Sequence, residues 1–249
     1  MHLYFSTKAG MKMQINRIFV IYAYKHKLHY MINRKSILKF IGTGLCVASL
    51  FASCSTPATE QASGTATVDT SKIVIENIMA RRSIRQYKPQ PVNRDTMQII
   101  LNCGINAPNG QNKQSWAIRV VDDPEFINGI TDVFKEKNPD AKKSTRFKNM
   151  FRNAPTVVFI ANDTSYDMSQ IDCGLLGENM ILAAQSMGIG SCCLGSPVRF
   201  MTETPEAAEY LKRLDIPEGY SLLYCIAFGY PDEAPAAKPR DNSKIKFID

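Results

Sequence analysis

Four side chains that suit a bound phosphate lie close together in the sequence. They are Arg81, Arg82, Ser83 and Arg85. A guanidinium group donates paired hydrogen bonds to phosphate oxygens, and a hydroxyl group can donate one more. Basic clusters also occur on solvated surfaces with no ligand. The cluster therefore predicts a phosphate site only if other segments complete it.

Two further polar segments could complete such a site. The segment APNGQNKQSW, residues 107–116, is rich in amide side chains, which can donate to and accept from the edge of a planar heterocycle. Lys238 and Arg240 add cationic groups near the end of the chain. Each segment by itself also fits an ordinary polar loop or tail.

The distribution of histidine and cysteine excludes several kinds of catalytic site. All three histidines, His2, His26 and His29, precede residue 30, so the rest of the chain cannot form a Ser-His-Asp triad, a Cys-His pair or a zinc site that needs imidazole. No C-x-x-C pair is present, and we expect no metal site. We interpret the cysteines at positions 103, 173, 192, 193 and 225 as small apolar core residues, and a disulfide is an open alternative.

The net charge of +7 belongs to the N-terminal region. Residues 1–53 hold eight of the 30 lysine and arginine residues and none of the 23 acidic ones. The remaining residues carry 22 basic against 23 acidic groups, a net charge of −1. Nucleic-acid binding depends on an excess of positive charge. We therefore expect no nucleic-acid partner for the region after residue 53.

Residues 31–53 have the pattern of a bacterial signal peptide. A cluster of lysine and arginine precedes an apolar run that is too short for a comfortable membrane span. Cys54 follows Leu-Phe-Ala-Ser, which resembles a lipobox with Phe51 in place of the usual leucine. We expect a lipid on Cys54 that anchors the protein to a membrane, on the periplasmic or cell-surface side. An uncleaved membrane anchor is the alternative.

Composition divides the chain into four parts. Residues 1–30 are expected to lie upstream of a true start at Met31, which begins the signal peptide. Residues 54–70 are rich in Ser, Thr and Ala, cannot bury enough apolar surface to fold, and are expected to form a disordered tether. Residues 71–249 are expected to form one domain.

The hydrophobic periodicity of this domain predicts helices and strands without a regular βαβ order. Asn93 is expected to cap a helix whose buried side includes Met97, Ile100 and Leu101. Residues 138–153 are polar and basic, and we expect a mobile flap there. The predicted helices cover residues 71–80, a stretch after Asn93, and residues 124–137, 169–187 and 205–214. The predicted strands cover residues 116–121, 156–161, 191–194 and 221–227, and an irregular arm follows.

Four segments in this order resemble the FMN-dependent nitroreductase family. They are RRSIRQY, APNGQNKQSW, DCGLLGENMILAAQSMGIGSC and AFGYPDEAPAAKPR, and the resemblance runs from about Ile73 to Lys244. It implies an α+β sandwich in which helices flank a central, mostly antiparallel sheet. It also implies an intertwined homodimer with two FMN sites at the subunit interface.

The resemblance assigns flavin contacts to ten residues. Those that match the phosphate and pyrimidine contacts are Arg81, Arg82, Ser83, Arg85, Lys238 and Arg240. Those that match contacts near the flavin ring are Asn112, contributed by the other subunit, Gln114 as a weaker candidate, and the backbone of Gly190 and Ser191. Two departures from the family, Asn109 in place of Ser and Ser115 in place of Pro, leave the substrate pocket undefined.

The implied activity is that of an FMN-dependent oxidoreductase without a catalytic side chain of its own. NAD(P)H would reduce the flavin and leave, and a nitroaromatic, a quinone or a similar electron-poor small molecule would then accept the hydride in ping-pong turnover. Two alternatives stay open. One is a flavoenzyme of the same fold that removes halogen or cleaves flavin, and the other is a lipid-anchored protein that binds a ligand without turnover.

Overall fold

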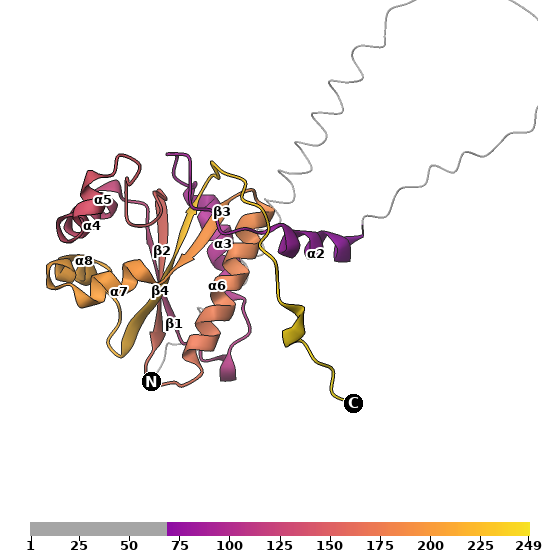
Figure 1. The fold of residues 1–249 in the computed structure, drawn as a ribbon. Coiled ribbons are helices and arrows are strands. Elements are labelled where there is room, and N and C mark those ends of the chain that lie inside the picture. The colour runs from indigo at the N-terminus through magenta and orange to yellow at the C-terminus, as the bar shows by residue number, and fades with distance from the viewer. Residues whose placement is uncertain (1–68) are drawn as a thin grey trace, which may run out of the picture. The chain divides into compact units, whose positions relative to one another are not determined.

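A computed structural model of the protein describes residues 69–249 (Figure 1). The predicted signal peptide, the lipid site at Cys54 and all of the tether except its last two residues lie outside the described residues. Within the described part, no helix is both long enough and apolar enough to cross a membrane.

A four-stranded antiparallel sheet forms the centre of the fold (Figure 1). Its order is β1 (Trp116–Val121), β2 (Thr156–Asp163), β4 (Tyr220–Gly229) and β3 (Gly190–Leu194). All residues of β2 except Asp163 are buried. Successive side chains of a strand point to opposite faces, so a strand buried along its whole length requires cover on both faces of the sheet.

Two helical layers supply that cover, and the short turn η2 (Pro205–Ala207) leads into α8 (Ala208–Arg213). On one face, Ile100 and Met180 share a core cluster with Val158 and Ile160 of β2. On the other face, Phe126 and Met201 share a second cluster with Phe159. The first layer is α3 (Arg94–Ile105) and α6 (Ser169–Ser186); the second is α4 (Pro124–Lys137), α7 (Ser196–Glu203) and α8 (Ala208–Arg213).

Local signals explain where these helices begin and end. The side chain of Asn93 accepts a hydrogen bond from Asp95 N at 2.8 Å and caps α3, as predicted. Asp123 caps α4, which has Pro124 in its first turn. Gly188 has a φ of +72°, a left-handed conformation that favours glycine, and it follows the end of α6. Leu101 of α3 is only partly buried.

The segment between α4 and β2 differs from the prediction of a mobile flap. A short helix, α5 (Pro139–Lys143), follows α4. The next turns are anchored, because Met150 and Phe151 are buried in the core. Asn153 Oδ1 also accepts hydrogen bonds from Lys148 N and Asn149 N at 2.8 and 2.9 Å. The flap prediction is wrong for this buried part of the segment.

The two ends of the described chain expose apolar side chains. Helix α2 (Thr70–Ala80) has no buried residue and projects from the body (Figure 1). Between 47% and 70% of each of its large apolar residues is exposed: Ile73, Val74, Ile75, Ile78 and Met79. After the turn η3 (Asn242–Lys244), Ile245, Phe247 and Ile248 are exposed as well. Neither end buries a large apolar side chain among the described residues.

Candidate functional site

The Arg-rich segment, residues 81–85, lies along the edge strand β3. Ser83 and Ser191 form a parallel bridge, and Ile84 N donates to Ser191 O at 2.9 Å. The Ile84 side chain is buried in the core, which fixes the segment in register. The structure therefore brings the predicted phosphate cluster together with Gly190 and Ser191, far apart in sequence.

The residues after the cluster are tied to the start of the C-terminal arm. Tyr87 and Pro231 form an antiparallel bridge, and Asp232 N donates to Gln86 O at 2.9 Å. The buried Tyr87 hydroxyl donates to Ile84 O at 2.5 Å. Burial raises the pKa of Tyr87, so this hydroxyl stays protonated and keeps donating at neutral pH. The side chain of Glu233 accepts from the backbone of Arg85.

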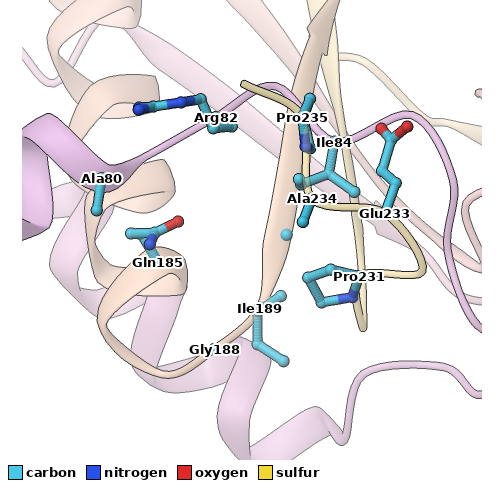
Figure 2. Close-up of a pocket in the computed structure, with 11 residues that line it drawn as sticks. Ala80, Arg82, Ile84, Gln185, Gly188, Ile189, Pro231, Glu233, Ala234 and Pro235 are labelled. Atoms are coloured by element: carbon cyan, nitrogen blue, oxygen red, sulfur yellow. The ribbon is translucent and has the colours of Figure 1, made fainter. Parts of the chain in front are cut away.

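A cavity of about 400 Å³ opens beside this segment (Figure 2). Its walls come from the Arg-rich segment, the end of α6, the start of β3 and the arm. Residues that line it include Arg82, Ile84, Gln185, Gly190, Pro231 and Glu233. A second hollow, of about 590 Å³, is lined by Arg85 and Glu233, and Arg146 and Arg152 supply further positive charge there.

The arginine side chains of the cluster differ in their contacts. Arg82 Nη1 donates to Met79 O at 2.6 Å and to Arg81 O at 2.8 Å, so it caps the end of α2 and runs back toward the helix that carries Ala80 (Figure 2). Arg85 Nη1 donates to Ser83 O at 3.1 Å. Within residues 69–249, the side chains of Arg81 and Ser83 take part in no hydrogen bond or ion pair. Their donors are free for a ligand.

Lys238 and Arg240 lie on the exposed part of the arm, which leaves the body of the fold (Figure 1). Arg240 Nη1 donates to the nearby carbonyls of Lys238 and Pro239, at 3.1 and 3.4 Å. Among the described residues, no hydrogen bond or ion pair joins these two cations to the Arg-rich segment. Cations do not bond to one another directly, so a role of Lys238 and Arg240 at the phosphate stays a prediction.

The loop that carries Asn112 has an unusual backbone. Gln111, Asn112 and Gln114 have φ angles of 53°, 53° and 50°, in the left-handed region, around the short turn η1 (Gly110–Asn112). Asn109 Oδ1 accepts from Gln114 N at 2.9 Å, so the departure at this position still supplies a hydrogen bond. The side chains of Asn112 and Gln114 are exposed.

This loop and the Arg-rich segment lie at opposite ends of α6 (Figure 1). Gly110 N bonds to Asp172 in the first turn of α6, whereas Gln185, near the last residue, lines the cavity. At 1.5 Å per residue, the helix carries these two positions about 20 Å apart. One chain therefore does not bring Asn112 to the Arg-rich segment.

The sequence did not predict the hydrogen bonds by which four residues hold these segments in place. These residues are Ser115, Asp172, Tyr87 and Glu233. A signal existed for Asp172, because it lies four residues before Leu176, on the buried side of α6. An acidic residue on that side must find partners. No comparable pattern marks Glu233, whose contact depends on the path of the arm.

Three of the five cysteines, Cys173, Cys192 and Cys225, are buried and behave as packing residues. Cys103 and Cys193 are exposed, so the interpretation as core residues is wrong for these two. Cys103, Cys173, Cys192, Cys193 and Cys225 are all free thiols. Burial raises the pKa of Cys173 to about 12 and raises that of Cys192, so neither thiol is an activated nucleophile at neutral pH. No group of three or more His, Cys, Asp and Glu side chains within residues 69–249 is placed to hold a metal ion.

Known proteins resemble this chain in sequence and in fold. A relative from Archaeoglobus fulgidus, named for NADH dehydrogenase and NAD(P)H nitroreductase activities, is 31% identical over 164 residues, which cover 64% of this chain and 86% of the relative. The NADPH-flavin oxidoreductase of Vibrio harveyi is 28% identical and covers 67% and 69% of the two chains. A nitroreductase of Bacteroides fragilis, solved with bound FMN, superposes with a TM-score of 0.61 at 28% identity and covers 71% of this chain and 98% of that one.

A match to a family model agrees with both the sequence pattern and the fold. The model of the Nitroreductase family matches residues 78–230, which span the Arg-rich segment, the sheet, α6 and the start of the arm. The predicted fold, helices around a mostly antiparallel sheet, is confirmed. The chain belongs to the nitroreductase family.

Proposed function

We propose that this protein is an FMN-dependent oxidoreductase that uses NAD(P)H to reduce electron-poor small molecules such as nitroaromatics and quinones. The observation that carries the proposal is the Arg-rich segment, pinned against β3 beside a cavity of about 400 Å³. The family match and the FMN in the Bacteroides fragilis nitroreductase support the same cofactor here.

The residues present fit FMN. Arg81 and Ser83 lie two positions apart in the segment that pairs with β3, and a phosphate can accept from a guanidinium group and from a hydroxyl group. Gly190 brings the chain close to Ile84 and Pro231, since a Cβ on it would lie 2.9 Å from Ile84 Cγ1. We infer that Arg81 and Ser83, joined by Lys238 and Arg240, hold the phosphate, and that Arg85 lies at the pyrimidine edge.

The protein's part in the reaction is binding and orientation. FMN, when bound, supplies hydride transfer between NAD(P)H and an acceptor. A cationic group such as Arg85 near the pyrimidine edge favours negative charge there. Ile84 and Pro231 give the cavity an apolar wall, which would exclude water from one side of a bound flavin.

We further propose that two copies of the chain build each site. The separation of about 20 Å along α6 prevents one chain from supplying both Asn112 and the Arg-rich segment to one flavin ring. The apolar side chains of α2 are exposed in the single chain, which is unusual for a monomer and typical of an interface. We infer a homodimer in which Asn112 of one copy faces the Arg-rich segment of the other.

The first test compares FMN with riboflavin, which lacks the phosphate. The purified protein should be yellow, or become so with FMN, and should bind FMN at least about tenfold more tightly than riboflavin, because the phosphate contacts are charge-assisted. The loaded protein should oxidise NADH or NADPH with a quinone or a nitroaromatic as acceptor. Equal affinity for the two flavins would contradict the phosphate site.

The same assays separate the alternatives. A protein that binds FMN but passes no electrons to either acceptor would favour a ligand-binding role. Release of halide from a halogenated phenol, or loss of the flavin itself in the presence of oxygen, would favour the two other reactions. Product analysis by mass spectrometry distinguishes them.

We also propose that Cys54 carries a lipid that holds the protein at a membrane on the periplasmic or cell-surface side. The support is the sequence around Cys54 alone. Labelling with radioactive palmitate should be lost in Cys54→Ala and retained in Cys103→Ala. Equal labelling of both variants would exclude the anchor.

A further inference from the structure

A buried carboxylate holds the loop that carries Asn112, and we propose that Asp172 is a positioning residue for Asn112 at the flavin. The inference rests on the proposed function, because it takes Asn112 as a flavin contact. Asp172 lies in the first turn of α6, and only 3% of it is exposed.

Both oxygens of the Asp172 carboxylate accept hydrogen bonds from the loop. Gly110 N donates to Oδ1 at 3.1 Å, and Ser115 Oγ donates to Oδ2 at 2.7 Å. Gly110 precedes the left-handed residues and Ser115 follows them, so one carboxylate fixes both ends of the loop. Ser115 is 1% exposed, and solvent cannot replace its partner.

The backbone between the two anchors needs this support. Gln111, Asn112 and Gln114 have φ angles of 53°, 53° and 50°, a region that residues other than glycine adopt at a cost and keep only where surroundings impose it. Without the carboxylate, these residues would relax toward negative φ. The Asn112 side chain would then point elsewhere.

The chain offers a matched set of variants. Asp172→Ala removes both acceptors, whereas Asp172→Asn keeps both links, because its oxygen accepts from Gly110 N while its amide donates to Ser115 Oγ. Ser169→Ala is the control. Ser169 also lies in the first turn of α6 and is 1% exposed, but its hydroxyl accepts from Asn162 Nδ2 at 2.9 Å and does not contact the loop.

The first readout is hydrogen exchange in the flavin-free protein. Amides of residues 110–115 should exchange about tenfold faster in Asp172→Ala than in the wild type. In the variant, the loop can open without first breaking the two hydrogen bonds to Asp172. Asp172→Asn and Ser169→Ala should match the wild type over these residues. If Asp172→Ala does not fold, Ser115→Ala, which removes one of the two bonds, should show a smaller increase. Unchanged exchange would overturn the proposal.

The second readout is a double-mutant cycle on FMN affinity. Asp172→Ala should weaken FMN binding by about the same factor as Asn112→Ala, and the double variant should bind no more weakly than Asn112→Ala, because both changes remove one interaction. Asp172→Asn should restore the affinity. Multiplicative losses in the double variant would show that Asp172 does not act through Asn112, and would overturn the proposal.

Two outcomes separate this inference from the proposed function. If Arg81→Ala weakens FMN binding and Asn112→Ala does not, the FMN site stands and the role of Asp172 falls. If the wild-type protein takes up no FMN, the proposed function and the role of Asp172 both fall.

Discussion

Gly190 shows how one residue without a side chain keeps the Arg-rich segment against β3. A Cβ here would lie 2.9 Å from Ile84 Cγ1 and 3.0 Å from Pro231 Cγ. We expect Gly190→Ala to lower the free energy of unfolding by roughly 1–3 kcal/mol and to weaken FMN uptake, because Ile84 must move and the segment moves with it. Urea denaturation and FMN titration measure the two effects. Gly195→Ala, whose Cβ would meet nothing within 4 Å, is the control, and equal losses in both variants would contradict the packing argument.

Arg240 tests whether the arm reaches the phosphate. Among residues 69–249, its guanidinium donates hydrogen bonds only to carbonyls of its own arm. If it binds phosphate in the loaded protein, Arg240→Ala should cost roughly 1.5–3 kcal/mol of FMN binding, one charge-assisted contact. Fluorescence titration gives the affinity, with Lys244→Ala as a control on the same arm. An unchanged affinity in Arg240→Ala would remove the residue from the site.

The site residues could be proposed from the sequence only in part. The Arg-rich segment lies beside Gly190 and Ser191 of β3, because a bridge at Ser83 and a buried Ile84 tie them together, and their contacts with a flavin stay a prediction. The pairing of Asp172 with Ser115 joins positions 57 residues apart, and no local pattern specifies such a contact. The distance of Asn112 from the Arg-rich segment depends on the length of α6. The sequence predicts that helix but does not show that the two groups lie at its opposite ends.

At the scale of elements, Arg94 joins the start of α3 to the end of β1. Its guanidinium donates to both carboxylate oxygens of Asp122, at 2.7 and 2.8 Å, and this hydrogen bonding lowers the pKa of Asp122. A lowered carboxyl pKa stabilises the folded state above the unfolded pKa, and the effect is lost as pH falls through the folded value.

We therefore expect Arg94→Gln to lower the melting temperature at pH 7, and we expect this deficit to shrink as the pH falls from 7 through the lowered pKa of Asp122 in the folded chain. Thermal melts followed by circular dichroism across this range give the comparison. Lys142→Gln, an exposed cation outside every ion pair of the described residues, should show no pH-dependent difference. A deficit in Arg94→Gln that persists in acid would rule out the ion pair as its cause.

The elements themselves were largely predictable, and the exceptions have physical causes. β1 has its predicted bounds, and α4 begins at a proline and ends where predicted. α7 was not predicted, because its eight residues, with three buried side chains, are too few to show a helical repeat of apolar residues. α5 has five residues and none buried, so it left no hydrophobic signal. The buried Met150 and Phe151 lie among polar residues that masked them.

At the scale of the whole molecule, α2 is the element that requires a partner. We expect the wild-type protein to sediment as a dimer. Ile75→Glu should shift it toward a monomer and weaken FMN binding, because a carboxylate replaces an apolar side chain that is 60% exposed in the single chain. Val120→Glu changes another exposed apolar residue, on the edge strand β1, and should remain dimeric. A dimeric Ile75→Glu protein would exclude α2 from the interface.

Asn112 and the Arg-rich segment lie at opposite ends of α6, and this separation has a genetic consequence. Asn112→Ala and Arg81→Ala each damage both sites of a dimer made from one variant alone. In a mixed dimer, one site carries both defects and the other carries neither. Co-expression of the two variants, or unfolding and refolding of their mixture, should therefore restore one functional flavin site per mixed dimer. Two defective alleles would complement each other within a single gene, whereas a site built from one chain would leave the mixture as defective as its components.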